Sequence, residues 1–256
     1  MIRSFAARNL SARQKSNIRN IACRLGGYVR RPVETLVEDV VRCDGARTFL
    51  QIGANDGYLS DPLNLAIFRH KLTGTFVEPQ ASYYRELQKT YRDFSGMLFL
   101  QYAIAETSGV MTMYTLDCSG GRLPGWAHGV GTLSREQIRK FGDQIDDIES
   151  YIRANEVQCI TVDDLLDRTA HRDPDIIVVD AEGFDHAILS QFNFTQLSTK
   201  LVIYETESMT SGHAADLARR LQEGGYAIFE ADQDTIALRR DTATFRRKNA
   251  ADSKAA

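Results

Sequence analysis

The sequence predicts an α/β domain built around a mostly parallel sheet. Short strand-like runs alternate with helical patterns from about residue 48 to residue 222, which is typical of a parallel sheet with helices packed on it. The runs 49–57 (FLQIGANDG) and 75–79 (TFVEP) have the layout of a βαβ unit with a glycine turn. The last two strand-like runs flank Asp232-Gln233-Asp234, a hairpin signature that predicts one antiparallel strand at the C-terminal end.

Each helix is predicted from apolar residues at helical spacing, and each strand from a short apolar or alternating run. The predicted helices cover 32–43, a segment that begins near Pro62, 82–91, 134–155, 185–192 and 214–222. The predicted strands cover 48–52, 74–77, 97–103, 110–116, 157–161, 175–180, 201–204, 226–230 and 235–238.

The chain is expected to form one domain with an insertion and two basic ends. At 256 residues with 43% hydrophobic content it can bury one sizeable core, predicted over 34–240. A glycine-rich stretch followed by a polar run predicts a lid over the sheet edge at about 117–156. Residues 1–33 are expected to form a basic extension, and 241–256 a basic tail without regular structure.

The sequence predicts a cytoplasmic protein. No apolar run approaches the ~18 residues of a transmembrane helix, and the N-terminus lacks the apolar region of a secretory signal. The four cysteines are scattered singly, without metal-ligand spacing, as expected of reduced thiols. They are Cys23, Cys43, Cys118 and Cys159.

Charge is distributed unevenly along the chain. Residues 1–33 hold eight Lys/Arg and no acid, whereas residues 34–238 hold 17 basic and 32 acidic residues, a net charge of −15. Nucleic acid is not expected as a partner, because an acidic body repels phosphates. Apolar Ile18, Ile21, Leu25 and Val29 have helical spacing among the arginines. They predict an amphipathic helix that could lie on an anionic membrane or dock on a partner, the alternative being a solvated terminus.

The ends of the predicted parallel strands bring polar or small residues to one rim. In an open parallel sheet, ligands bind beyond the carboxyl ends of the strands, where the strand order reverses. The rim residues are 51–57, Glu78, Ala103-Ile104, 180–182 and 205–207. Gly53 and Gly57 have GxxxG spacing, without the GxGxxG of a pyrophosphate-binding turn. The rim is rich in acids, which favours a cationic nucleotide-like cofactor such as S-adenosylmethionine.

These motifs together resemble the FkbM-type family of class I S-adenosylmethionine-dependent methyltransferases. The resemblance covers about residues 48–238 and rests on several segments in combination. They are IGANDG at 52–57, VEP at 77–79, YAIAETSG at 102–109, VQCITVDDLL at 157–166, DIIVVDAEGFDHAIL at 175–189 and YETE at 204–207.

The resemblance implies a Rossmann-like seven-stranded sheet with a reversed last strand, and methyl transfer to a hydroxyl of a sugar, glycan or secondary metabolite. It implies that Gly53, Asn55 and Gly57 hold the methionine part of the cofactor, together with neighbouring Asp56. It implies that Glu78 holds the ribose, and that Ala103 and Ile104 flank the adenine. The family often has an acid where this chain has Gln51, whose amide can still accept a hydrogen bond from the cofactor's amino group.

Methyl transfer to a hydroxyl calls for a general base. Asp180 and Glu182 are the first candidates because a strand end presents them beside the cofactor, although Asp180 could instead cap the following helix. His128 is a third candidate if the lid closes, against the simpler reading of an exposed loop histidine. No metal site is predicted.

Two other functions share this pattern. An NAD-dependent oxidoreductase has the same βαβ layout and an acid like Glu78, but this chain lacks the third glycine and an evident Tyr/Lys pair. A degenerate methyltransferase fold could serve as a binding module, against which the retained Glu78, Asp180 and Glu182 argue. The identity of the acceptor and the oligomeric state are not encoded in a readable pattern.

Overall fold

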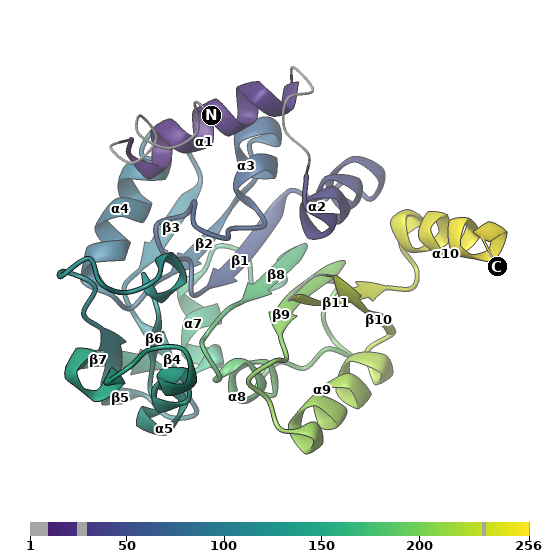
Figure 1. The fold of residues 1–256 in the computed structure, drawn as a ribbon. Coiled ribbons are helices and arrows are strands. Elements are labelled where there is room, and N and C mark those ends of the chain that lie inside the picture. The colour runs from purple at the N-terminus through teal and green to yellow at the C-terminus, as the bar shows by residue number, and fades with distance from the viewer. Residues whose placement is uncertain (1–9, 25–29, 232–233, 256) are drawn as a thin grey trace.

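A seven-stranded sheet with the order β10-β11-β9-β8-β1-β2-β3 forms the centre of the protein in the computed structural model, which describes residues 10–24, 30–231 and 234–255 (Figure 1). Its strands are β1 (Thr48–Ile52), β2 (Thr73–Val77), β3 (Met97–Leu100), β8 (Ile176–Val179), β9 (Leu201–Glu205), β10 (Tyr226–Ala231) and β11 (Asp234–Arg239). Strand β11 is antiparallel to both β9 and β10, and the other pairings are parallel. The predicted fold class, with one reversed strand near the C-terminal end, is confirmed.

Helices cover both faces of this sheet. One face carries α2 (Pro32–Cys43), α3 (Asn64–His70) and α4 (Ala81–Tyr91), and the other carries α7 (Val162–Arg168), α8 (Asp185–Leu189) and α9 (Ser211–Glu223) (Figure 1). Alternate strand residues supply the two cores, so that Phe49 packs with the first set of helices and Leu50 with the second. The order reverses between β1 and β8, which opens the carboxyl edge of the sheet there.

The inserted region contains a second, four-stranded sheet with the order β4-β7-β5-β6. The predicted strand 97–103 divides into β3 and β4 (Ala103–Ile104), and β4 belongs to this second sheet. The remaining elements are β5 (Gly109–Leu116), a short 3-10 helix (Gly125–Ala127), β6 (Gly131–Thr132), α5 (Arg135–Arg139), a second 3-10 helix (Lys140–Asp143), α6 (Ile148–Tyr151) and β7 (Ile152–Ile160).

The predicted continuous helix over 134–155 is therefore only partly correct. It is divided into α5, the second 3-10 helix and α6. Its end is wrong, because residues 152–155 belong to β7, which pairs with β5 from Leu116↔Ile152 to Gly109↔Cys159. The first half of β7 is polar and mostly exposed, so no apolar alternation marks it as a strand. The conformation of this segment is set by its pairing with β5. The strand propensity of the segment's own residues does not reveal a pairing partner that is distant in the sequence.

The predicted N-terminal helix is present as α1 (Ala12–Arg24), which packs on α3 and α4 (Figure 1). Its inner side carries Ala12, Ser16 and Asn20, whereas Ile18 and Ile21 are 54% and 57% exposed. Leu25 and Val29, which complete the predicted apolar stripe, lie outside the described residues. Contact of 1–33 with an anionic membrane stays a prediction. No helix in the described ranges is long and apolar enough to cross a bilayer.

The C-terminal tail, expected to lack regular structure, forms α10 (Ala243–Ala255). The Asp44 carboxylate accepts hydrogen bonds from the backbone N–H groups of Ala243 and Thr244 at the start of this helix. A carboxylate at a helix N-terminus satisfies donors that have no partner within the helix. The cap comes from about 200 residues upstream, so the sequence of the tail alone does not reveal it.

Candidate active site

A cavity opens at the carboxyl ends of β1, β2, β8 and β9, with β4 and the inserted region completing its wall. Six acidic side chains line it, and its lining within the described residues includes no lysine or arginine. The six are Asp61, Glu78, Asp180, Glu182, Glu205 and Asp234. The cavity therefore favours a cationic ligand over an anionic one.

The glycine turn begins directly after β1, beside the residue that follows β8. Gly53 has φ of 79°, and a Cβ there would lie 1.7 Å from the carbonyl oxygen of Asp180. Glycine alone fits both the left-handed backbone and the close approach. The N–H groups of Gly53 and Ala54 both donate to the carbonyl of Val77 at the end of β2, which fixes the turn above the cavity.

Glu78 stands at the end of β2 and is 3% exposed. One carboxylate oxygen accepts a 2.9 Å hydrogen bond from the N–H of Asn55, and the other a 2.8 Å bond from the N–H of Gln80. Burial raises the pKa of Glu78 to about 7. Each oxygen keeps a second lone pair, so the fixed carboxylate can also accept hydrogen bonds from a ribose diol in the cavity.

Gln51 lines the cavity at the end of β1 and is 3% exposed. Its Oε1 has no hydrogen-bond partner in the part of the chain that the structure describes. A buried acceptor without a partner is costly, and a donor from a bound ligand would satisfy it. The residue that departs from the family pattern therefore still fits the amino group of S-adenosylmethionine.

The residues expected to flank the adenine lie in the cavity wall, and their role toward adenine stays a prediction. Ala103 and Ile104 are buried in β4 and line the cavity, and adjacent Tyr102 lines it too. Tyr102 was not predicted, because its position between two strands was read as the interior of one.

Two predicted cofactor residues shape the turn and do not line the cavity. Asp56 Oδ1 accepts hydrogen bonds from the N–H groups of Tyr58 and Leu59, at 2.9 and 2.7 Å. Gly57 faces the other way, where a Cβ would lie 2.5 Å from the ring of Tyr91. The six residues of the 52–57 turn do not all face the cavity, because the backbone changes direction within the turn.

Asp180 and Glu182 reach the cavity from the loop after β8. Asp180 is exposed to the cavity, and Glu182 is placed by a left-handed backbone with φ of 48°. In the described residues neither carboxylate has a hydrogen-bond or ion-pair partner. Asp180 does not cap the following helix, because Asp185 accepts from the N–H of Ala181 in that loop.

The carboxylates at this end of the cavity raise one another's pKa. Burial and then the charge of Asp234 raise the pKa of Asp180 to about 6. Burial and then the charge of Asp180 raise the pKa values of Glu182 and Asp185 to about 8 and of Glu205 to about 7. Acidic groups are therefore concentrated in the described cavity lining, which holds no lysine or arginine, and their proximity disfavours the charged forms.

The lid lies directly against the cofactor turn. The carbonyl of Gly129 accepts a 2.7 Å hydrogen bond from Gln80 Nε2, and a Cβ on Gly129 would lie 1.9 Å from Asn55 Nδ2. Trp126 and His128, both exposed, line the same cavity. The lid thus contributes one wall of the site, and the proposed role of His128 stays a prediction. No group of His, Cys, Asp and Glu suited to a metal ion occurs among the described side chains.

A glycine turn at the strand-order reversal, with a buried carboxylate at the end of the next strand, has the layout of a Rossmann-like nucleotide site. The family model described as Methyltransferase FkbM domain matches residues 51–242. The chain therefore belongs to the FkbM family of class I methyltransferases, which use S-adenosylmethionine as methyl donor. This assignment replaces the alternative of an NAD-dependent oxidoreductase.

Among solved structures, methyltransferases match this chain at low sequence identity, and one of them has a TM-score above 0.5. Methyltransferase FkbM from Methylobacillus flagellatus is 16% identical with a TM-score of 0.51, and the match covers 90% of this chain and 59% of that one. The O-methyltransferase from Bacillus cereus in complex with SAH is 11% identical with a TM-score of 0.38, covering 89% of this chain and 90% of that one. Among curated proteins, none matches this sequence.

Replacing Glu78 by alanine should weaken binding of S-adenosylhomocysteine at least about tenfold, because the ribose loses its acceptor and two backbone N–H groups lose theirs. Isothermal titration calorimetry measures this directly. Glu86→Gln is a suitable control, since Glu86 pairs with Lys89 on the surface. Equal affinities of the alanine variant and the wild-type protein would contradict the ribose assignment.

The ligand-free protein should lose stability as pH rises from about 5 to 8. Unfolding lets Glu182, Asp185 and Glu205 release protons that the folded state holds to about pH 7–8, so a rise in pH lowers the free energy of the unfolded state relative to the folded state. The carboxylates whose pKa values are lowered in the folded state titrate below about pH 5, so they do not oppose this loss of stability. Thermal unfolding at several pH values should show a falling midpoint, and a smaller fall in Glu182→Gln. A midpoint that rises to pH 8 would refute this.

Proposed function

We propose that the protein methylates a hydroxyl oxygen of an uncharged sugar, glycan or sugar-like metabolite. The observation that supports this most is the pair Asp180 and Glu182, two carboxylates that face the cavity with no partner among the described residues. Bound S-adenosylmethionine supplies an electrophilic methyl group. The protein then has to orient the acceptor hydroxyl in line with it and remove the hydroxyl proton.

The two carboxylates suit different tasks. Asp180, with a pKa of about 6, is ionised at neutral pH and is more basic than an ordinary carboxylate, so we assign it as the general base. Glu182, with a pKa of about 8, keeps its proton at neutral pH and can donate a hydrogen bond that orients the acceptor. Neighbouring acids whose pKa values are pushed apart commonly divide acid and base roles in this way.

The lining of the cavity also bears on the acceptor. Phosphate or carboxylate groups on an acceptor would meet six acidic residues and no lysine or arginine in the lining as described. Carboxylates accept hydrogen bonds from sugar hydroxyls, and the exposed ring of Trp126 offers an apolar face on which a sugar could stack. These features support a neutral polyhydroxyl acceptor over an anionic one.

Asp180→Asn should lower single-turnover methylation at least about 100-fold, in line with the contribution of a general base. Glu182→Ala should lower it as well, because the acceptor hydroxyl loses the hydrogen bond that orients it. S-adenosylhomocysteine affinity should stay within a few-fold. The assay uses methyl-labelled cofactor and a panel of neutral sugars and glycans with their phosphorylated counterparts. Glu207→Gln is the matched control, because Glu207 also follows β9 but is exposed and outside the cavity lining. Undiminished turnover in both variants would overturn the base assignment.

The single-turnover rate should rise with pH through about 6 as Asp180 ionises, and fall above about 8 as Glu182 loses its proton. Because the two groups interact, the apparent values belong to the pair. A pH–rate profile tests this, and Asp180→Asn should lose the rising limb while keeping the falling one. A rising limb unchanged in that variant would show that another group titrates.

A further inference from the structure

The loop between the glycine turn and α3 forms one wall of the cavity, through Leu59, Ser60, Asp61 and Pro62. Asp61 is 2% exposed. Its Oδ1 accepts hydrogen bonds from the N–H groups of Leu63 (2.7 Å) and Asn64 (3.1 Å), and its Oδ2 accepts one from the Tyr91 hydroxyl (3.2 Å). The carboxylate therefore sets the shape of this wall from within.

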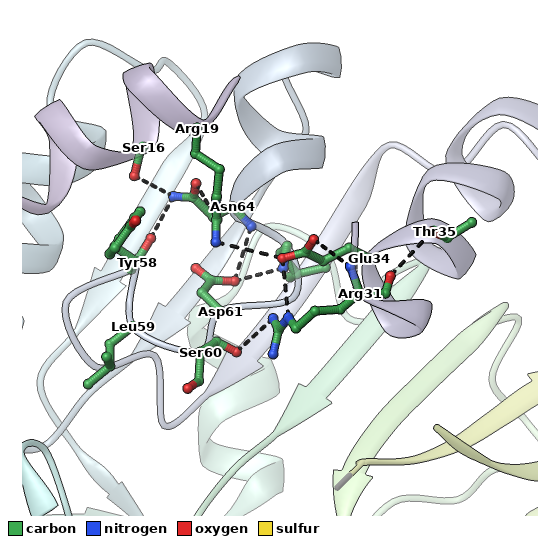
Figure 2. A network of polar contacts seen from close by, with 12 residues as sticks. Ser16, Arg19, Arg31, Glu34, Thr35, Tyr58, Leu59, Ser60, Asp61 and Asn64 are labelled. Carbon is green, nitrogen blue, oxygen red and sulfur yellow. Dashed lines mark hydrogen bonds and ion pairs between the residues drawn. The ribbon is translucent and has the colours of Figure 1, made fainter. Parts of the chain in front are cut away.

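Asn64 connects the wall to the N-terminal helix. Its side chain is fully buried, and its Nδ2 donates to the carbonyl of Gly57 at 2.7 Å and to the hydroxyl of Ser16 at 2.9 Å. Its Oδ1 accepts a 2.7 Å hydrogen bond from Arg19 Nη2. One amide thus joins the end of the glycine turn to two residues of α1 (Figure 2).

Arg19 lies at the centre of this network and points inward from α1 (Figure 2). Its side chain is 10% exposed, its Nη1 lies 3.6 Å from Glu34 Oε1, and its guanidinium stands 4.9 Å from the ring centre of Tyr58. Burial raises the pKa of Asp61 to about 6, and the charge of Arg19 opposes that rise. Arg19 therefore helps to keep the wall carboxylate ionised.

Arg31 makes a parallel contact from the segment that leads into α2. Its Nη2 donates to the carbonyl of Ser60 at 3.1 Å, and its Nε lies 3.3 Å from Glu34 Oε1. The N-terminal region thus contacts the wall directly at Ser60, and it contacts Tyr58 and Asn64 on either side of the wall in sequence. Arg13 of the same helix differs, since it pairs with Asp93, whose side chain is 59% exposed, and does not touch the wall.

Burying a guanidinium is costly unless its charge and its donors are matched by partners. A solvated extension would leave Arg19 in water, whereas here it meets Asn64, Glu34 and the ring of Tyr58. Its removal would leave Asn64 Oδ1 and Glu34, which is 3% exposed, with fewer partners. The loss of these interactions would destabilise the segment that contains the cavity wall.

We propose that Arg19 is a positioning residue for the methyltransferase site: through Asn64 and Asp61 it holds residues 57–62 in the shape that receives the cofactor. The N-terminal helix is then part of the framework of the active site. The proposal concerns the cofactor half of the cavity, so it holds or fails independently of the proposed hydroxyl acceptor.

Arg19→Met should weaken S-adenosylhomocysteine binding about tenfold and speed amide hydrogen exchange of residues 57–64 by a similar factor, since a buried acceptor loses its donor. Arg13→Met, which loosens the same helix at the surface, should change both by less than about twofold. Calorimetry and exchange followed by mass spectrometry measure the two effects on the full chain. Equal losses in the two variants, or none in Arg19→Met, would overturn the proposal.

A double-mutant cycle tests whether Arg19 acts through Asn64. Adding Arg19→Met to Asn64→Ala should weaken binding little beyond Asn64→Ala alone, because both changes break one connection. Fully additive losses would contradict that route. If Arg19→Met does not fold, Arg31→Ala tests the wall contact at Ser60 and should weaken binding about threefold. Unchanged binding and exchange in Arg31→Ala would then count against the proposal.

Discussion

The close approach of Gly53 to the carbonyl of Asp180 is the constraint on which the site depends. Gly53 directly follows β1 and Asp180 directly follows β8, and a single methyl group on Gly53 would collide with that carbonyl. The same contact turns the backbone above Glu78 and brings Asp180 to the cofactor turn. The glycine turn and Asp180 are therefore brought to one cavity at the reversal of strand order.

The second constraint is electrostatic. Acidic residues gather at the carboxyl edge of the sheet without a basic residue in the described cavity lining, and burial adds to their repulsion. Such a cluster costs folding free energy in the ligand-free protein. A cationic methyl donor offsets part of that cost when it binds, so the feature that destabilises the fold also selects its ligand. Active sites often store free energy in this way.

Much of the fold and of the donor site could be predicted from the sequence because the signals are local. Short β-branched runs mark buried parallel strands, and residues at their ends must meet at one edge. Gly53, Glu78 and Asp180 were found by that reasoning, and the structure brings them together. It failed for the first half of β7 and for α10, whose conformations depend on β5 and on Asp44, partners distant in the chain.

The sequence by itself determined the alternation of strands and helices, the glycine turn and the acids at the strand ends, because each follows from spacing along the chain. It also showed a basic N-terminus with an apolar stripe. Only the tertiary structure decided which way those side chains face: Arg19 points inward to Asn64, while Ile18 is exposed. The physical reason is that the side of a helix that becomes buried depends on the groups against which the helix packs. Here those groups include a buried carboxylate and a buried amide, Glu34 and Asn64, which interact favourably with an arginine and not with an isoleucine.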